Sequence, residues 1–265
     1  MTVFLFSDSS SVPSQQRKFS APHKETWAQG ILPQVKKPKV VPQSKWPLFQ
    51  EWQKLGDETA TNIMIHGLRL SFHTEPTLSL EPDPSILTGF SQSQKILPFI
   101  PDWIRNSYVR EIFNPTPLFF SRMFTVPKKN GRLRPVIDLS VLNKLLIVPK
   151  FRMESVARIT KAITSPKWGT TTDLEDAYFK VPVEEESQIY LAFTLFDQSL
   201  GFYRIFVFQV MPFGLSSAPW TFTRVLKPIK IHLHLRDMTI FSYLNNFLNL
   251  AESPLQVKSQ TSHKS

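Results

Sequence analysis

The chain has 265 residues, 42% of them hydrophobic, so it is long enough for one large domain or two small ones with a packed core. Its net charge of +10 favours a polyanionic partner, either nucleic acid or an anionic membrane surface, although a merely soluble basic protein is the alternative. Cysteine is absent, which excludes disulfides, cysteine zinc sites and a cysteine nucleophile, and no apolar run approaches the roughly 20 residues that cross a bilayer.

The first hundred residues are predicted to contain little regular structure. Residues 1–48 are rich in Ser, Pro, Gln and Lys, which is typical of a solvated, disordered segment. The alternative is that its lysines form a localisation patch or contact phosphate. Residues 49–100 form a second, partly helical region, with one helix predicted from Phe49 to Leu68 before a proline-broken loop.

From about residue 101 the sequence shows clear helix and strand patterns. Residues 100–113 predict a helix and residues 118–127 predict a strand. Asn130-Gly131 is a strong hairpin signal, and residues 132–139 return as the second strand. Taken alone, the basic tip of this hairpin favours protection of a sheet edge by charge, with a phosphate clamp as the alternative. The basic residues at the tip are Lys128, Lys129, Arg132 and Arg134.

The rest of the chain mixes strands with one long helix. Strands are predicted at 167–174, 189–196 and 202–210, and a helix at 220–235 that Pro228 bends or delays. A hairpin follows in residues 239–254, with its tight turn at Asn245-Asn246, and residues 255–265 form a polar tail. Helices mixed with antiparallel strands predict an α+β fold.

Asp173 ends the predicted strand 167–174, and Asp176 and Tyr178 follow it closely. An aspartate at a strand end is often only a turn former, and a lone tyrosine is more often a core aromatic than a ligand contact. The neighbouring motifs favour a functional role for Asp173. A basic hairpin precedes it, and a turn with Phe213-Gly214 and a second hairpin follow it.

This order of motifs resembles the reverse transcriptases, in particular those of DIRS-type and gypsy-like retrotransposons. The resemblance covers residues 119–254, about half of the chain. It implies a right-hand polymerase fold with fingers and palm within residues 101–254. The residues that carry it are VPKKNGRLRPVIDLSVLNK (126–144), DLEDAYFKVPV (173–183), YLAFTL (190–195), MPFGLSSAPWTFTRVL (211–226) and SYLNNFL (242–248).

The resemblance also implies an activity and its partners. The activity is RNA-directed DNA synthesis on an RNA or DNA template–primer, with deoxynucleoside triphosphates as substrates and other retroelement proteins as partners. We expect the protein inside the cell, in the nucleus or the cytoplasm, with no membrane partner, because the first ten residues lack a basic signal-peptide start.

Roles for single residues follow from the resemblance. Two Mg²⁺ ions would serve phosphoryl transfer, with the Asp173 carboxylate and the Leu174 backbone carbonyl among their oxygen ligands. Tyr178 would lie under the sugar and exclude a 2′-hydroxyl. The triphosphate would be held by Lys128, Arg132 and Arg134 and by backbone N–H groups around Asp176 and Ala177, and the template–nucleotide pair would pack on Phe213 and Gly214.

The hairpin at 242–248 departs from the family pattern. The family has an aromatic residue, any residue and two metal-binding aspartates, whereas this chain has Tyr243-Leu244-Asn245-Asn246. A neutral amide ligates a cation far more weakly than a carboxylate, so we expect impaired catalysis. A non-catalytic nucleic-acid-binding remnant, an active polymerase and a relic without function are the alternatives. No counterpart of a thumb or ribonuclease H domain follows, so a decayed or truncated copy is expected, with a gene model that ends early as the alternative.

Overall fold

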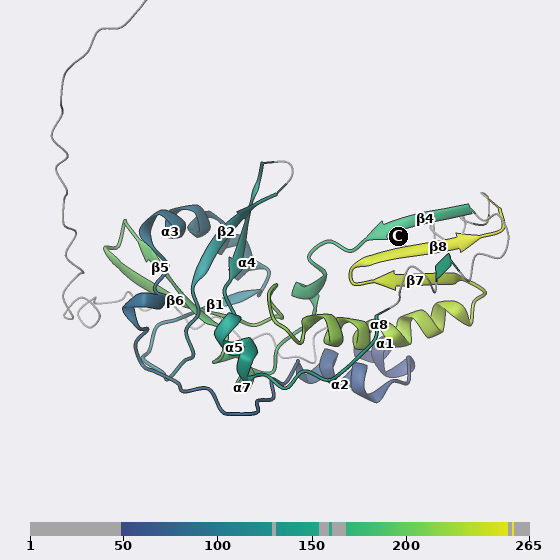
Figure 1. The fold of residues 1–265 in the computed structure, drawn as a ribbon, viewed down its shortest axis with the longest axis horizontal. Coiled ribbons are helices and arrows are strands. Elements are labelled where there is room, and N and C mark those ends of the chain that lie inside the picture. Colours follow the sequence, from purple (N-terminus) through teal and green to yellow (C-terminus); the bar gives the residue numbers. More distant parts are fainter. Residues whose placement is uncertain (1–48, 129–130, 154–158, 161–167, 254–255, 257–265) are drawn as a thin grey trace, which may run out of the picture. The chain divides into compact units, whose positions relative to one another are not determined.

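The computed structural model describes residues 49–128, 131–153, 159–160, 168–253 and 256 (Figure 1). Segment 1–48 and residues 254–255 and 257–265 lie outside the described residues, as do Lys129 and Asn130 of the predicted hairpin tip. The helices are α1 (Phe49–Lys54), α2 (Glu58–His66), α3 (Phe90–Ile96), α4 (Ile100–Arg105), α5 (Ser140–Leu145), α7 (Glu185–Gln188) and α8 (Ala218–His234), with short 3₁₀ turns at Pro84–Ile86, Leu97–Phe99 and Ala177–Lys180. The strands are β1 (Val109–Ile112), β2 (Met123–Pro127), β3 (Leu133–Ile137), β4 (Trp168–Asp173), β5 (Ala192–Asp197), β6 (Phe202–Phe208), β7 (Thr239–Tyr243) and β8 (Asn246–Ala251).

All strand pairing between these elements is antiparallel and forms three sheets. One sheet has the order β1-β6-β5, the second is the β2-β3 hairpin, and the third has the order β4-β8-β7. Figure 1 shows the third sheet lying over α8, with α1 and α2 beside the same helix. The mixture of helices and antiparallel sheets confirms the α+β prediction.

A continuous hydrophobic core holds these elements together. Its centre is a set of fully buried phenylalanines and aliphatic residues on β5 and β6, because both of these strands are covered on their inner face. Phe193 and Phe206 stack with ring centres 5.5 Å apart, and Phe193 lies 5.3 Å from Phe208. The same core extends to Phe222 and Val225 on the inner face of α8.

The single helix predicted from Phe49 to Leu68 is wrong: the structure has two helices there. Gly56 takes a left-handed conformation, with φ of +71°, and ends α1. Asp57 then caps α2, because its side chain accepts a hydrogen bond from Ala60 N at 3.0 Å. Propensity alone did not reveal this break, since a lone glycine inside a helical pattern is tolerated.

The helix predicted over 100–113 is also wrong in its second half. α4 ends at Arg105, Ser107 turns the chain with φ of +59°, and Val109–Ile112 joins β6 as strand β1. The pairing with β6 buries Val109, and this tertiary gain overrides the local helical pattern.

The long helix starts earlier than predicted and continues through its proline. α8 begins at Ala218, Pro219 lies in its first turn, and Pro228 is buried inside the helix. A proline in the first turn loses no helical hydrogen bond, which explains the early start. Among the described residues, no helix is long and apolar enough to span a bilayer.

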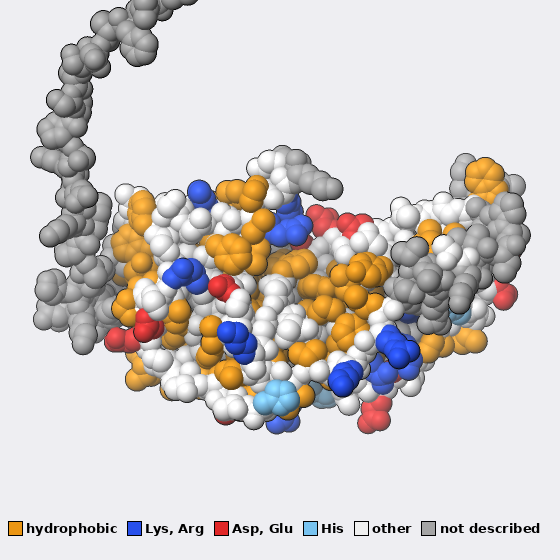
Figure 2. Space-filling view, viewed as in Figure 1, with side chains coloured by type: hydrophobic (Ala, Val, Ile, Leu, Met, Phe, Trp, Pro, Cys, Tyr) orange, Lys and Arg blue, Asp and Glu red, His pale blue; other side chains and the backbone are white. Residues whose placement is uncertain are grey.

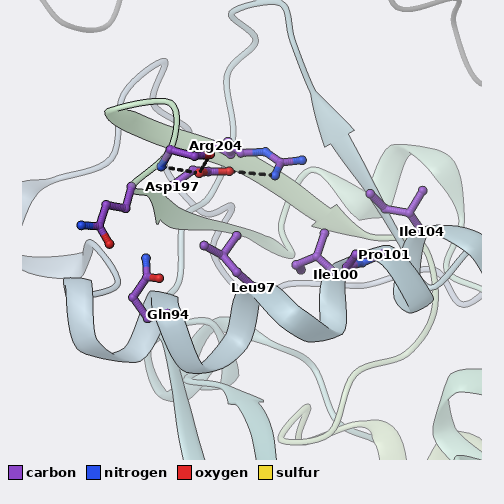
Figure 3. A pocket seen from close by; sticks show the side chains of 9 residues that line it. Gln94, Leu97, Ile100, Pro101, Ile104, Asp197 and Arg204 are labelled. Atoms are coloured by element: carbon purple, nitrogen blue, oxygen red, sulfur yellow. Dashed lines mark hydrogen bonds and ion pairs between the residues drawn. The ribbon is translucent and has the colours of Figure 1, made fainter.

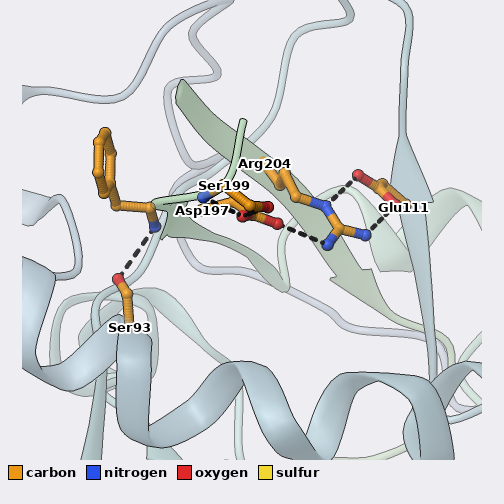
Figure 4. Close-up of polar contacts among 6 residues, drawn as sticks. Ser93, Glu111, Asp197, Ser199 and Arg204 are labelled. Carbon is orange, nitrogen blue, oxygen red and sulfur yellow. Dashed lines mark hydrogen bonds and ion pairs between the residues drawn. The ribbon is translucent and has the colours of Figure 1, made fainter. Parts of the chain in front are cut away.

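A half-buried charge network ties the β1-β6-β5 sheet together (Figure 4). Arg204 on β6 donates from Nε and Nη2 to the two carboxylate oxygens of Glu111 on β1, at 2.7 and 2.6 Å, and from Nη1 to Asp197 Oδ2 on β5, at 3.2 Å. Ser199 donates to the other Asp197 oxygen from its backbone N and from its hydroxyl. Partial burial alone would raise the pKa of Asp197, but the hydrogen bonds from Ser199 and Arg204 hold that pKa below its ordinary value.

Replacing Arg204 with methionine is expected to lower the free energy of unfolding by about 2 kcal/mol or more, because it leaves two carboxylates partly buried without their partner. Because the folded-state pKa of Asp197 is lowered, its contribution is complete above the unfolded pKa and is lost as the pH falls through the folded one. The difference between the natural chain and Arg204→Met should therefore shrink below about pH 4. Urea unfolding of both chains at pH 7 and pH 3 measures this difference in the free energy of unfolding. Arg105→Met, which breaks an exposed pair with Asp102, is the control and should change stability by less than about 1 kcal/mol at either pH; equal losses in the two variants would contradict the expectation.

Candidate active site

Asp173 lies at the end of β4, directly opposite Asn246, the first residue of β8. Asn246 in turn pairs with Tyr243, the last residue of β7, so that the three strands bring Asp173, Asn246 and Tyr243 to one end of the sheet. Paired residues of an antiparallel sheet share a face, so these three side chains leave the sheet on the same side. All three are exposed, which makes this end of the sheet accessible to a ligand.

The turn of the hairpin is Leu244-Asn245, one residue earlier than predicted. Leu244 takes the left-handed conformation with φ of +53°, and Asn246 already belongs to β8. The turn is joined to the end of β4 through main-chain and side-chain contacts. Leu174 N donates to Asn245 O at 2.9 Å, and the side-chain Nδ2 of Asn245 donates to Asp173 Oδ1 and, at 3.4 Å, to Leu174 O.

Two Mg²⁺ ions do not fit the side chains present at this site. Mg²⁺ takes oxygen ligands in octahedral geometry, preferably with carboxylates. The Asn245 amide directs an N–H donor, and not its oxygen, toward Asp173, and Asn246 Nδ2 points to Asn245 Oδ1 at 3.4 Å. Among the described residues, no three His, Cys, Asp or Glu side chains gather where they could hold a metal ion. The Asp173 carboxylate is therefore partnered by the amide of Asn245.

Aromatic rings form a platform that reaches toward this hairpin. The rings of Tyr178 and Phe213 lie 5.0 Å apart, and Tyr178 also meets Phe222 of α8 edge-on at 5.4 Å. Burial raises the pKa of Tyr178, and the charge of Tyr243 adds to the rise. The hydroxyl of Tyr178 therefore stays protonated at neutral pH and is able to donate a hydrogen bond.

The basic hairpin contributes one residue to the platform. The Arg134 guanidinium carbon lies 5.7 Å from the centre of the Phe213 ring, within the range of a cation–π contact. Lys128 and Arg132 are exposed at the outer end of the same hairpin, where Lys128 N donates to Arg132 O at 2.7 Å. The structure thus places Arg134 on Phe213, whereas Lys128 and Arg132 lie toward the tip.

The backbone changes handedness directly after β4. Asp176 is left-handed, with φ of +49° and ψ of +34°, and precedes the 3₁₀ turn Ala177–Lys180. Consecutive N–H groups at such a change of handedness point into one concave space. Asp176 is exposed and Ala177 is buried, so the main chain here is open to solvent on the side of Asp176.

One residue of this region escaped the sequence prediction. Asn143 on α5 donates from Nδ2 to Gly214 O and accepts from Ser216 N at Oδ1, both at 2.8 Å. Asn143 lies inside the stretch 126–144 that carries the resemblance, but the sequence assigned it no role, because an asparagine near the end of a short helix is usually read as a solvent-exposed residue. Contacts that join residues about seventy positions apart become visible only in the fold.

A hollow of about 740 Å³ lies elsewhere, between α3, α4 and the β5-β6 turn. Figure 3 shows Leu97, Ile100, Pro101 and Ile104 on one side of it and the Asp197–Arg204 pair on the other. No predicted site residue lines it, and its charged groups already satisfy one another in the Arg204 network. It is therefore separate from the candidate active site.

Comparison with known proteins gives one family and several relatives. The family model described as reverse transcriptase (RNA-dependent DNA polymerase) matches residues 126–263. The chain is 28% identical over 231 residues, 79% of its length, to the retrovirus-related Pol polyprotein from transposon 297 of Drosophila melanogaster, and covers 20% of that protein. It is 26% identical over 250 residues, 87% of its length, to the Gag-Pro-Pol polyprotein of bovine leukemia virus, covering 18% of it.

A third relative is the transposon Tf2-7 polyprotein of Schizosaccharomyces pombe, 27% identical over 162 residues, which are 60% of this chain and 11% of that protein. The chain thus spans a fifth or less of the length of these curated relatives.

Proposed function

Because this chain belongs to the reverse transcriptase (RNA-dependent DNA polymerase) family, we propose that it binds a primer–template duplex and a deoxynucleoside triphosphate but transfers the nucleotide poorly. The fingers of the proposed right-hand fold include the β2-β3 hairpin, and its palm is the β4-β8-β7 sheet with α8. The motif order favours an origin in a DIRS-type or gypsy-like retrotransposon. Support for the binding half of the proposal comes from the net charge of +10 and from the Arg134–Phe213–Tyr178 platform.

The hydrogen bond from Asn245 Nδ2 to Asp173 Oδ1 is the observation that carries the catalytic half. Nucleotidyl transfer by two metal ions needs several carboxylates to balance a charge of +4. Here Asp173 brings one negative charge, and its neighbours across the hairpin are two neutral amides. An N–H donor pointing at a carboxylate takes the place of cation coordination, so we expect the family's metal ions to bind weakly.

Roles within the proposed complex follow from the geometry around Phe213. Arg134, and Lys128 farther out, would meet the triphosphate, with Arg132 beside them. The main chain at Asp176 and Ala177 would cradle phosphate oxygens. Tyr178 would face the sugar, and Phe213 with Gly214 would support the nucleotide pair. The Lys and Arg side chains on the face seen in Figure 2 are dispersed between hydrophobic areas.

Equilibrium binding and primer extension on the same preparation test this function. We expect the natural chain to bind a labelled DNA primer annealed to an RNA template, with log affinity falling by roughly three or more per tenfold rise in salt, since several phosphates are neutralised. We expect no extension of that primer with Mg²⁺ and the four deoxynucleoside triphosphates. Extension would identify an active polymerase, and failure to bind would leave a relic without function.

A bare nucleic-acid-binding remnant is the second candidate, supported by the charge of +10 alone. The two candidate functions differ in how the deoxynucleotide complementary to the next template base changes the affinity for the duplex. In the proposed function it tightens the complex several-fold, and Lys128→Ala/Arg134→Ala removes this effect. The matched control Lys54→Ala/Arg105→Ala removes two cations that pair with Glu51 and Asp102 on exposed helices, and it should keep the effect. If the nucleotide does not change the affinity of the natural chain for the duplex, the chain is the nucleic-acid-binding remnant.

A further inference from the structure

α5 is anchored so that Asn143 faces the turn between β6 and α8. Leu139, Leu142 and Leu146 are buried in the core and hold one side of the helix. Asp138 sets its start, because its Oδ1 accepts hydrogen bonds from Ser140 N at 3.0 Å and from Ser140 Oγ at 2.5 Å. These contacts fix the orientation of α5, and with it the position of Asn143 on the other side of the helix.

Asn143 holds the turn at two points. Its Nδ2 donates to Gly214 O, and its Oδ1 accepts from Ser216 N, so the side chain spans Leu215, which is buried. The turn needs such a support because it lies between the end of β6 and the start of α8 and belongs to neither. Gly214 has φ of +100°, and a Cβ there would lie 3.2 Å from Ile137 O, so the main chain is pressed against β3.

The turn carries Phe213, whose ring contacts Arg134 and Tyr178, two of the residues proposed to face the nucleotide. Phe213 contacts Tyr178 and Phe179, with ring centres 5.0 and 5.4 Å away, and lies under the Arg134 guanidinium. Arg134 comes from β3 and Tyr178 from the segment after β4, so Phe213 is the part that these two sequence-distant side chains share. A shift of the turn would change the spacing between the cation and the tyrosine ring.

We propose that Asn143 is a positioning residue for the incoming deoxynucleotide: it fixes the 213–216 turn, and through Phe213 it fixes the separation of Arg134 and Tyr178. This inference rests on the proposed function for the nucleotide itself. Asn143 does not touch the reacting atoms. Its effect is on the affinity for the nucleotide and not on the chemical step, because the Asp173 end of the sheet is held by different contacts.

Steady-state kinetics in the Asn245→Asp/Asn246→Asp background test the effect on the nucleotide. Asn143→Ala is expected to raise KM for the deoxynucleotide at least about tenfold, because it removes both hydrogen bonds to the turn, with kcat changed less than about threefold. Asn143→Asp keeps the acceptor for Ser216 N but loses the donor to Gly214 O, and should raise KM in the same direction. Val141→Ala truncates an exposed side chain on the same helix and should change neither constant. An unchanged KM, or a fall in kcat alone, would overturn the inference.

Titration of Tyr178 in the natural chain tests the positioning without any activity. The signal of Tyr178 is obtained by subtracting the ultraviolet titration of the Tyr178→Phe form of each variant. Asn143→Ala should bring the raised pKa of Tyr178 back toward its ordinary value, because a released Phe213 lets water reach the ring, while Val141→Ala should not. If the revertant background fails to extend primers, the catalytic proposal fails while this titration still decides on Asn143. An unchanged titration would refute the positioning role of Asn143. Asn143→Asp, which retains the side-chain volume, replaces Asn143→Ala in this test if the alanine variant does not fold.

Discussion

Replacing Asn245 and Asn246 together with aspartate is expected to raise Mg²⁺-dependent primer extension at least 100-fold over the natural chain. Removal of one electrostatic donor from an active site commonly lowers the rate by about 10²–10³-fold, and two positions are restored here. The change puts carboxylates at the turn and at the position opposite Asp173, both open to solvent-borne cations. Without a cation these carboxylates repel Asp173, so the revertant should also gain thermal stability from Mg²⁺, whereas the natural chain should not.

Asn62→Asp/Asn114→Asp is the matched control for this prediction. It adds the same two charges at exposed positions that precede the basic hairpin in the sequence. Extension assays on RNA and DNA templates, with Mg²⁺ and then Mn²⁺, compare the three chains. Extension by the natural chain would show that the asparagines do not disable it. If the Asn245→Asp/Asn246→Asp variant binds the duplex but does not extend the primer, the defect lies outside these two residues.

Gly67→Ala is expected to destabilise the fold by more than about 3 kcal/mol, a large part of the 5–15 kcal/mol that stabilises a typical domain. Gly67 has φ of +93°, and a Cβ there would lie 2.3 Å from Glu184 N and 2.6 Å from Val183 C. Both atoms are backbone and cannot rotate away. The following residue, Leu68, donates to Pro182 O at 2.7 Å and accepts from Glu184 N at 3.1 Å, so the two chain segments are locked at this distance.

Gly56→Ala separates backbone strain from the close approach. Gly56 also has a positive φ, +71°, but a Cβ there would meet no atom within 4 Å, so the loss should be about 1–2 kcal/mol. Chemical unfolding followed by circular dichroism measures both variants. Similar losses at the two glycines would contradict the expectation. A large loss at Gly67 alone would show that residues 57–72, which precede the family match at 126, are an integral part of this fold.

Periodicity and turn chemistry predicted the sheet elements well. The strands at β4, β5 and β6, the hairpin of β7 and β8 and the α+β class are confirmed, because each strand is bounded by clear turn signals and has a strong apolar pattern. The predictions were wrong where one glycine or one serine in a left-handed conformation broke a helical pattern, at Gly56 and Ser107. The strand predicted over 118–127 is also too long, because β2 begins only at Met123. The division of the chain into a region 49–100 and a domain 101–254 stays a prediction.

The residue types of the candidate site could be read from motif order, but their relations could not. The pattern identified Asp173, Tyr178, Phe213 and the two asparagines. It did not show that the turn is Leu244-Asn245, that the Asn245 amide donates to Asp173, or that Arg134 lies on Phe213. A motif gives the side chain and its place along the strand, whereas the direction of an amide depends on the atoms opposite it.

The sequence by itself determined the family, the α+β class and the presence of two neutral amides, Asn245 and Asn246, in the last hairpin, because these depend on residue identity and on order along the chain. Only the tertiary structure decided how the Asn245 amide contacts Asp173, and how Asn143 holds the turn that carries Phe213. The physical reason is that these contacts join residues some 70 positions apart. A hydrogen bond across such a separation depends on how the strands and helices pack, and no local pattern encodes it.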